Sequence, residues 1–200
     1  MDDALTEPEI VALTADHMQA AAEIRRVALW QRLPWLPDVH TPEEEEQYWR
    51  MHLLPNCSIL GAAMGNRLVG VIAYGDNWIE QLYVLPDFQG KGIGTSLLGC
   101  AKEDMNEIRL WTFQRSAGAR SFYEQHGFTA EEQTDGADNE EREPDVLYHW
   151  RRLPELTSPA GHPVIRICYR TQGRRISGLA KRLAWAKHEP HAGSALYCRG

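Results

Sequence analysis

The amino-acid sequence predicts a mixed α/β domain of about 150 residues, in which helices flank a central, mostly antiparallel sheet. Two observations predict this class. Short apolar runs bounded by turn residues alternate with segments in which apolar residues recur at helical spacing. Three of the apolar runs follow one another with only short turns between them, which is typical of antiparallel strands.

The first third of the chain is expected to form one strand and two helices. Residues 10–13 read as a strand, residues 14–30 as a helix and residues 30–39, with two prolines, as a loop. Thr41 and Glu44 have the spacing of a capping box and predict a second helix start. The remaining strands are expected at 58–64, 68–74, 79–85, 109–113, 128–132 and 146–150, and the remaining helices at 93–105 and 117–126.

The net charge of -7 is divided unevenly along the chain. Residues 1–154 contain 13 Lys and Arg against 26 Asp and Glu, whereas residues 155–200 contain 8 against 2. This division predicts a compact domain over 1–154 and a basic, poorly ordered extension over 155–200. An acidic domain repels phosphate, so nucleic acid is not expected as a partner of the core.

Several other classes of protein are disfavoured by composition. No apolar run is long enough to span a membrane, and the acidic first residues do not resemble a secretory signal. Cys57, Cys100, Cys168 and Cys198 are far apart, which predicts free thiols in a reducing compartment such as the cytoplasm. The histidines and cysteines show no ligand spacing, so no metal site is expected.

A glycine-rich loop between an expected strand and an expected helix is the strongest chemical signal. Glycine lets the backbone approach an anion closely, and the N–H groups of the following helix start can bind phosphate. A dinucleotide-binding fingerprint would need glycine at position 95, and the P-loop pattern is absent, so the loop alone leaves the ligand open. The loop consists of Gln89, Gly90, Lys91, Gly92, Ile93, Gly94 and Thr95.

A second motif lies downstream, at residues 119–128, and ends in Tyr123, three further residues, Gly127 and Phe128. Together with residues 82–86 and the glycine loop, it resembles the GNAT superfamily of acyl-CoA N-acyltransferases, and the element order matches over residues 8–152. The resemblance implies the acyl-CoA N-acyltransferase fold and direct transfer of acetyl from acetyl-CoA to a primary amine. Residues 110–115, 135–136, 139–142 and 144–146 resemble a bacterial subgroup of predicted acetyltransferases, and this resemblance implies no particular acceptor.

The resemblance also implies roles for individual residues. Tyr123 would be the general acid, and the backbone N–H of Val84 would stabilise the oxyanion between two splayed strands. The family commonly has asparagine where this chain has Ser116, a weaker hydrogen-bonding residue that Gln114 could supplement. The expected cofactor-binding residues are Leu82, Tyr83, Val84, Gln89, Gly90, Lys91, Gly92, Ile93, Gly94, Thr95, Gln114 and Ser116.

The general base is expected to be Glu80. Alternation along a strand would place it on the same face as Leu82 and Val84, where an apolar environment would raise its pKa. The alternative is that Glu80 is a solvated strand carboxylate, with His17, His40 and His52 as weaker candidates for the base.

The acceptor site is expected to involve Trp30, Trp35 and Trp78, which could form the wall of an apolar or cation-binding pocket. The alternative, which is favoured for each tryptophan taken singly, is that it serves only in packing. Selectivity is expected from the loops at 30–40 and 135–145. The acceptor is a small-molecule amine or a protein amine, and a homodimer is compatible with the family.

Two other functions remain open at this point. A non-catalytic acyl-CoA sensor could use the same fold, and Ser116 is the feature that allows it. An interaction protein could instead act through the basic segment 155–200.

Overall fold

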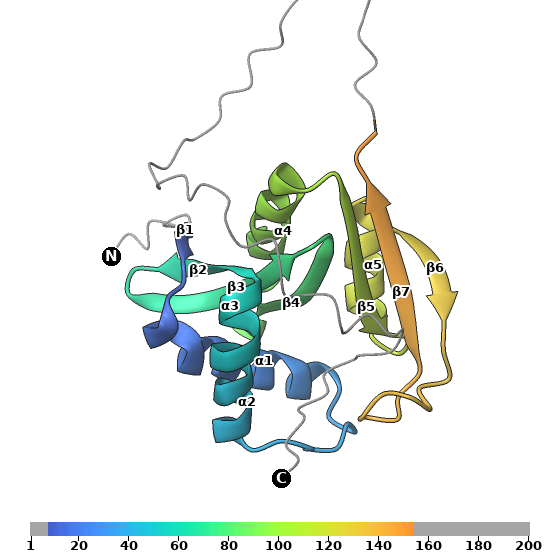
Figure 1. The fold of residues 1–200 in the computed structure, drawn as a ribbon, viewed down its shortest axis with the longest axis horizontal. Helices are drawn as coiled ribbons and strands as arrows, with labels where there is room; N and C mark the ends of the chain where they lie inside the picture. Colours follow the sequence, from blue (N-terminus) through green and yellow to red (C-terminus); the bar gives the residue numbers. More distant parts are fainter. Residues whose placement is uncertain (1–7, 154–200) are drawn as a thin grey trace, which may run out of the picture. The chain divides into compact units, whose positions relative to one another are not determined.

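The computed structural model describes residues 8–153, which fold into a sheet with helices on both faces (Figure 1). Of the sequence predictions, the basic extension at 155–200 lies outside the described residues. The elements are β1 (Glu9–Ala12), η1 (Ala15–His17), α1 (Met18–Arg32), α2 (Pro42–Tyr48), η2 (Trp49–Leu53), α3 (Leu54–Asn56), β2 (Ser58–Met64), β3 (Arg67–Gly75), β4 (Trp78–Val84), η3 (Pro86–Phe88), α4 (Ile93–Asp104), β5 (Glu107–Phe113), α5 (Ala117–Gln125), β6 (Thr129–Gln133) and β7 (Asp145–Arg151).

The seven strands form one sheet in the order β1-β2-β3-β4-β5-β7-β6. Neighbouring strands are antiparallel except β4 and β5, which are parallel. The predicted class, a mostly antiparallel sheet flanked by helices, is therefore confirmed. Within the described part of the chain, no helix is both long enough and apolar enough to cross a membrane.

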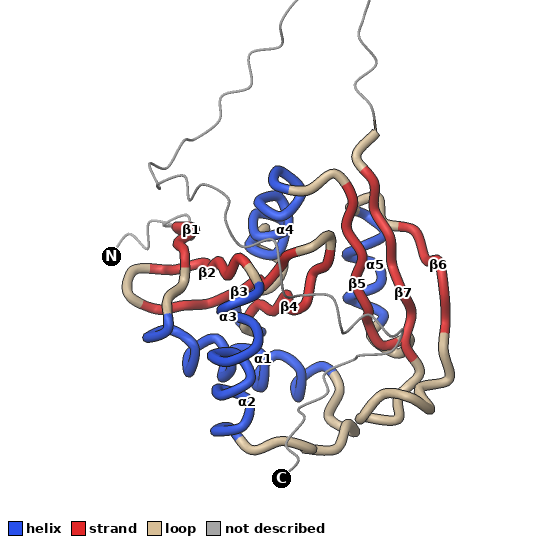
Figure 2. Tube along the Cα trace, viewed as in Figure 1, coloured by secondary structure: helices blue, strands red, loops and turns tan. Residues whose placement is uncertain are grey.

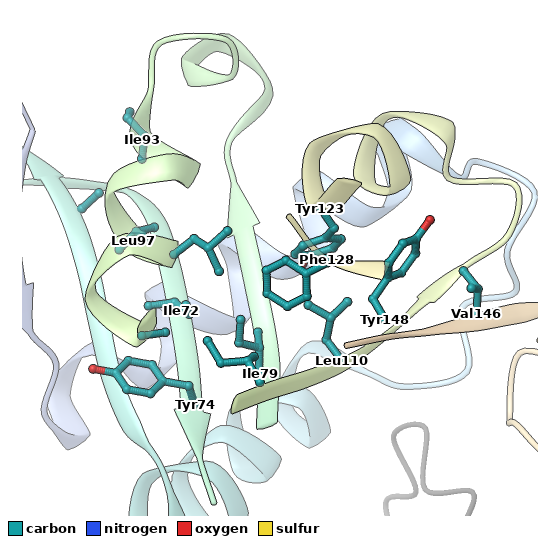
Figure 3. Packing of buried hydrophobic residues seen from close by; sticks show 14 of the residues in the cluster. Ile72, Tyr74, Ile79, Ile93, Leu97, Leu110, Tyr123, Phe128, Val146 and Tyr148 are labelled. Atoms are coloured by element: carbon teal, nitrogen blue, oxygen red, sulfur yellow. The ribbon is translucent and has the colours of Figure 1, made fainter. Parts of the chain in front are cut away.

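Two apolar clusters occupy the two faces of the sheet. One cluster joins α4 and α5 to the sheet, and Ile72, Leu97, Leu110 and Tyr123 are among its members (Figure 3). The other joins α1 and η2 to the opposite face around Trp49. Burial of these side chains is the main force that holds the helices to the sheet.

Local sequence signals set the bounds of the helices on the α1 side of the sheet. The capping box at the start of α2 forms as predicted, because Glu44 N–H donates to Thr41 Oγ1 at 3.2 Å and Thr41 N–H donates to Glu44 Oε2 at 2.8 Å. Helix α1 ends at Arg32, two residues beyond its predicted end at residue 30. Its end is set by Pro34, because a helix is disfavoured at the residue before a proline.

Strand β4 contains a bulge that the sequence pattern does not reveal. Ala73 pairs with Gln81, but the next residue of β3, Tyr74, pairs with Ile79. Glu80 is therefore an extra residue in β4. An extra residue of this kind interrupts the alternation of side chains between the two faces of a sheet.

The bulge overturns the expected orientation of Glu80. Leu82 and Val84 pack in the cluster beneath α4. The Glu80 carboxylate instead contributes to raised pKa values of Tyr48 and Cys57, which both pack on the α1 side. The prediction that Glu80 shares a face with Leu82 and Val84 is therefore wrong, because it assumed an unbroken alternation.

Candidate functional site

The centre of the sheet opens where β4 and β5 diverge. The two strands pair at a single position, Trp78 with Arg109, and Arg109 N–H also donates to the carbonyl of Asn77 at 2.7 Å. The strands then separate toward their carboxyl ends. Backbone groups along the inner edge of β4 are thus left without a partner strand in the described residues, as expected for a chain that holds a ligand between these strands.

Val84 presents its backbone N–H to this opening. The next residue, Leu85, donates its N–H to the carbonyl of Val69 on the β3 side at 2.8 Å. Successive residues of a strand direct their backbone groups to opposite edges, so those of Val84 point toward β5. The Val84 carbonyl accepts a hydrogen bond from Gln89 Nε2 at 2.8 Å.

The glycine loop is shaped to receive an anion. Gly90 and Gly92 have φ values of +73° and +81°, which L side chains rarely adopt, and a Cβ added at either would meet open space. Within the described chain, the N–H groups of residues 90–95 find no backbone or side-chain acceptor. Free N–H groups at the positive end of α4 are the arrangement that binds phosphate in proteins.

Two side chains of the loop have specific contacts. Lys91 Nζ lies 5.2 Å from the centre of the Phe88 ring, which holds a positive charge beside the loop. Thr95 Oγ1 lies 3.1 Å from Nε2 of His126, whose Nδ1 lies 2.7 Å from the carbonyl oxygen of Phe122. His126 was missed by the sequence reasoning, because nothing in its spacing links it to a loop 31 residues earlier.

Tyr123 belongs to α5, and its side chain is buried between that helix and the sheet, with 7% of the residue exposed. Its ring packs against Phe122, with a centroid distance of 5.3 Å. It also packs against Phe128 and Tyr148, at 5.5 and 6.1 Å, and Figure 3 shows these two rings beside it. Burial raises the pKa of Tyr123 far above its usual range, and the charge of Tyr83 adds to this. The hydroxyl therefore stays protonated and can serve as a donor but not as a base near neutral pH.

Charged and aromatic residues gather on the opposite face, over the middle of β4. Burial raises the pKa of Tyr48 to about 12, and the charge of Glu80 acts in the same direction. Arg25 Nη1 lies 2.9 Å from Glu45 Oε1, and both side chains are nearly buried. Burial also raises the pKa of the Glu45 carboxyl, and the neighbouring arginines act in the opposite direction.

The two loops that were expected to set selectivity meet on this face. The loop between α1 and α2 lies beside the loop between β6 and β7 (Figure 2). His40 Nε2 of the first loop lies 2.8 Å from Glu140 Oε2 of the second. Asn139 holds the second loop through Nδ2, which donates to the carbonyl of Glu143 at 2.8 Å. Tyr48 and Arg25 on this face were not singled out from the sequence, because their relation to β4 is visible only after folding.

The structure gives the surroundings of Gln114 and Ser116, two of the expected cofactor residues. The amide of Gln114 donates to the carbonyls of Thr134 and Asp145 at 2.8 and 2.9 Å, so it ties β5 to the β6–β7 end of the sheet. These bonds leave it no N–H to supplement Ser116. Ser116 is the residue before α5, is 9% exposed, and its side chain makes no capping hydrogen bond.

The three tryptophans do not gather around one pocket. Trp78 begins β4, at the end of the strand opposite Val84. Trp30 stacks beneath Arg26 with its ring centre 4.0 Å from the guanidinium carbon, and Trp35 does the same with Arg115. Trp30 and Trp35 are both exposed, at 38% and 43%. Residues 8–153 contain no cluster of side chains suited to hold a metal ion.

Comparison with protein families identifies the class. The model of the acetyltransferase (GNAT) family matches residues 24–128, more than half of the chain. The chain therefore belongs to the GNAT acetyltransferase family.

A curated relative supports this assignment. The uncharacterized N-acetyltransferase MJ1207 of Methanocaldococcus jannaschii is 33% identical over 84 residues, or 34% of this chain and 37% of the relative. The chain thus matches little more than a third of that relative's length.

Solved structures share the fold. The apo form of YjaB from Escherichia coli has a TM-score of 0.61 at 18% identity and covers 73% of this chain and 99% of its own. PaiA N-acetyltransferase of Thermoplasma acidophilum in complex with coenzyme A has a TM-score of 0.59 at 23% identity. The match covers 73% of this chain and 99% of the PaiA chain. The ribosomal-protein-S18-alanine N-acetyltransferase of Escherichia coli has a TM-score of 0.58 at 16% identity. The match covers 76% of this chain and 98% of that enzyme's chain.

Proposed function

We propose that this protein transfers an acetyl group from acetyl-CoA to a primary amine, directly and in a ternary complex. The observation that carries the proposal is the opening between β4 and β5 beside a glycine loop whose N–H groups have no acceptor in the described chain. The loop suits a diphosphate, and the opening suits the extended pantetheine arm that joins a diphosphate to a thioester. Among the neighbours, PaiA was solved in complex with coenzyme A.

The chain's own residues can promote each part of the reaction. Acetyl-CoA supplies the acetyl group as an activated thioester. The N–H of Val84 stabilises negative charge on the thioester carbonyl oxygen during attack by the amine. Tyr123 donates its phenolic proton toward the departing sulfur, since its pKa keeps it protonated.

The attacking amine must lose a proton, and Glu80 is the proposed acceptor of that proton. The bulge interrupts the alternation of side chains at Glu80, and the charge of Glu80 acts on Tyr48. These two observations support an approach of the amine from the face opposite α4. The acceptor is a small-molecule amine or an amine of a protein. Carboxylates of Glu80, Glu140 and Glu141 near this face favour an acceptor that carries positive charge.

The experiment that tests the function uses the purified full-length chain. Calorimetry measures CoA binding, and a thiol reagent follows CoA release from acetyl-CoA with a panel of polyamines, amino acids and peptides. Turnover that needs both acetyl-CoA and one class of amine is the expected result. Tight CoA binding without turnover on any amine would favour the sensor, which the Ser116 departure allows, and no CoA binding would refute both.

The proposal also covers the localisation and the oligomeric state of the protein. Cys57 and Cys100 are free thiols, consistent with a protein that works in the reducing cytoplasm. A homodimer remains a prediction from the family, to be measured by light scattering.

A further inference from the structure

Arg32, the last residue of α1, reaches across the opening of the site. Its Nη2 donates to Gln89 Oε1 at 2.5 Å, in the segment that leads from β4 to α4. Its Nη1 lies against the first turn of α5, where a Cβ built on Gly118 would fall 2.0 Å away. The guanidinium therefore lies between the segment that follows β4 and the segment that follows β5.

The charge of Arg32 has no carboxylate partner in the described chain, unlike Arg25, Arg26 and Arg50 on the same face. The start of α5 carries the positive end of a helix dipole, and the start of α4 lies beyond Gln89. Positive charge beside positive helix ends is unfavourable unless an anion joins them. Lys91, also without a carboxylate partner in residues 8–153, adds to this positive region.

A purely structural reading explains only part of this geometry. A cation in the last turn of α1 interacts favourably with the negative end of that helix. That reading would be satisfied by an arginine extending into solvent. It does not account for a side chain held by Gln89, whose amide also donates to the carbonyl of Val84.

We propose that Arg32 binds the diphosphate of coenzyme A and closes the glycine loop from the side of α1. This inference rests on the proposed function and adds a cofactor ligand outside both recognised motifs. The planar guanidinium can donate two parallel hydrogen bonds to phosphate oxygens, while Gln89 orients it. Gly118 provides the space in which the guanidinium lies.

Calorimetry on full-length variants tests the role of Arg32. Arg32→Ala should weaken CoA binding about tenfold, since the charge-assisted bonds lost are at an exposed site. Binding of pantetheine, which lacks the diphosphate, should be unchanged. Arg32→Lys should recover part of the affinity, and Arg50→Ala, which removes a surface arginine of the adjacent helical layer, should have no effect.

A second variant moves the guanidinium without removing its charge. Gly118→Ala should weaken CoA binding in the wild-type background but add little to Arg32→Ala, because both act through the same contact. Gly99→Ala is the matched helical control, since a Cβ at Gly99 meets open space.

The outcomes separate the inference from the function. If wild type binds CoA and Arg32→Ala binds it equally well, the inference is wrong and the function stands. Equal losses for CoA and pantetheine would show a structural role and overturn it. An Arg32→Ala effect that disappears with 3′-dephospho-CoA would overturn the diphosphate assignment in favour of the 3′-phosphate. Absence of CoA binding by wild type would reject the proposed function itself.

Discussion

At the scale of single residues, Tyr123 combines deep burial with a pKa that this burial raises far above the usual range. Tyr123→Phe removes only that hydroxyl and leaves the ring packing in place. We expect kcat to fall about a hundredfold, the low end of the usual gain from a general acid, with CoA affinity unchanged. Steady-state kinetics and calorimetry on the same preparation measure the two quantities.

The control for this variant is Tyr74→Phe, which removes the hydroxyl of a buried tyrosine that donates to Asp104 at 2.6 Å. It should lower stability but leave kcat close to wild type. A wild-type kcat in Tyr123→Phe would reject the acid role and leave Tyr123 as a core aromatic.

Gly92 offers a second test on a single residue, with Gly65 as the control position. Both residues have positive φ, +81° and +61°, and a Cβ at either meets open space. Alanine at each position should cost about 1–2 kcal/mol of unfolding free energy from backbone strain. Only Gly92→Ala should also weaken CoA binding, because only that Cβ would enter the space proposed for the diphosphate. Equal CoA affinity in both variants would contradict the proposed cradle.

At the scale of elements, the bulge in β4 decides which face Glu80 serves. If Glu80 accepts the proton of the amine, Glu80→Gln should lower kcat/KM for the amine about a hundredfold and remove the acid limb of the pH–rate profile. CoA affinity should stay constant. Glu23→Gln, on the exposed side of α1, is the charge-matched control. An unaltered acid limb in Glu80→Gln would assign the base to another group.

The elements also show how far sequence reasoning reaches. The helix and strand positions followed from periodicity and capping signals such as Thr41 with Glu44, because those signals are local. The bulge at Glu80 was not predictable, because one extra residue leaves no mark in the pattern. Gln114 illustrates the same limit, since its hydrogen bonds go to the carbonyls of Thr134 and Asp145, which lie 20 and 31 residues away in the sequence.

At the scale of the whole molecule, buried tyrosines link stability to alkaline pH. Burial raises the pKa of Tyr48 to about 12 from its ordinary value of 10.0. The folded state therefore retains a proton that the unfolded state releases above pH 10, so stability is full below pH 10 and falls as pH rises toward 12. Tyr48 alone should contribute a loss of about 1.4 kcal/mol per pH unit in that window. Urea unfolding between pH 8 and 11 should show a shallower decline for Tyr48→Phe, and an identical decline would contradict the assignment.

Arg152, directly after β7, fastens the end of that strand to the end of α4. Arg152 N–H donates to the carbonyl of Asn106 at 2.7 Å, and its guanidinium donates to the carbonyls of Lys102, Glu103 and Met105 at the end of α4. These bonds satisfy the free carbonyls of a helix end and fasten β7 to it.

We therefore predict that a chain ending at residue 154 folds and binds CoA with nearly wild-type affinity, whereas one ending at residue 148 does not fold. The shorter chain loses Arg152 and the last pairs of β7 with β5, including Ile108 with Trp150 and Glu107 with Arg151. Thermal unfolding and calorimetry of both chains measure the difference. Loss of CoA binding in the longer chain would show that residues 155–200 contribute to the site, and the domain boundary proposed at residue 154 would have to be abandoned.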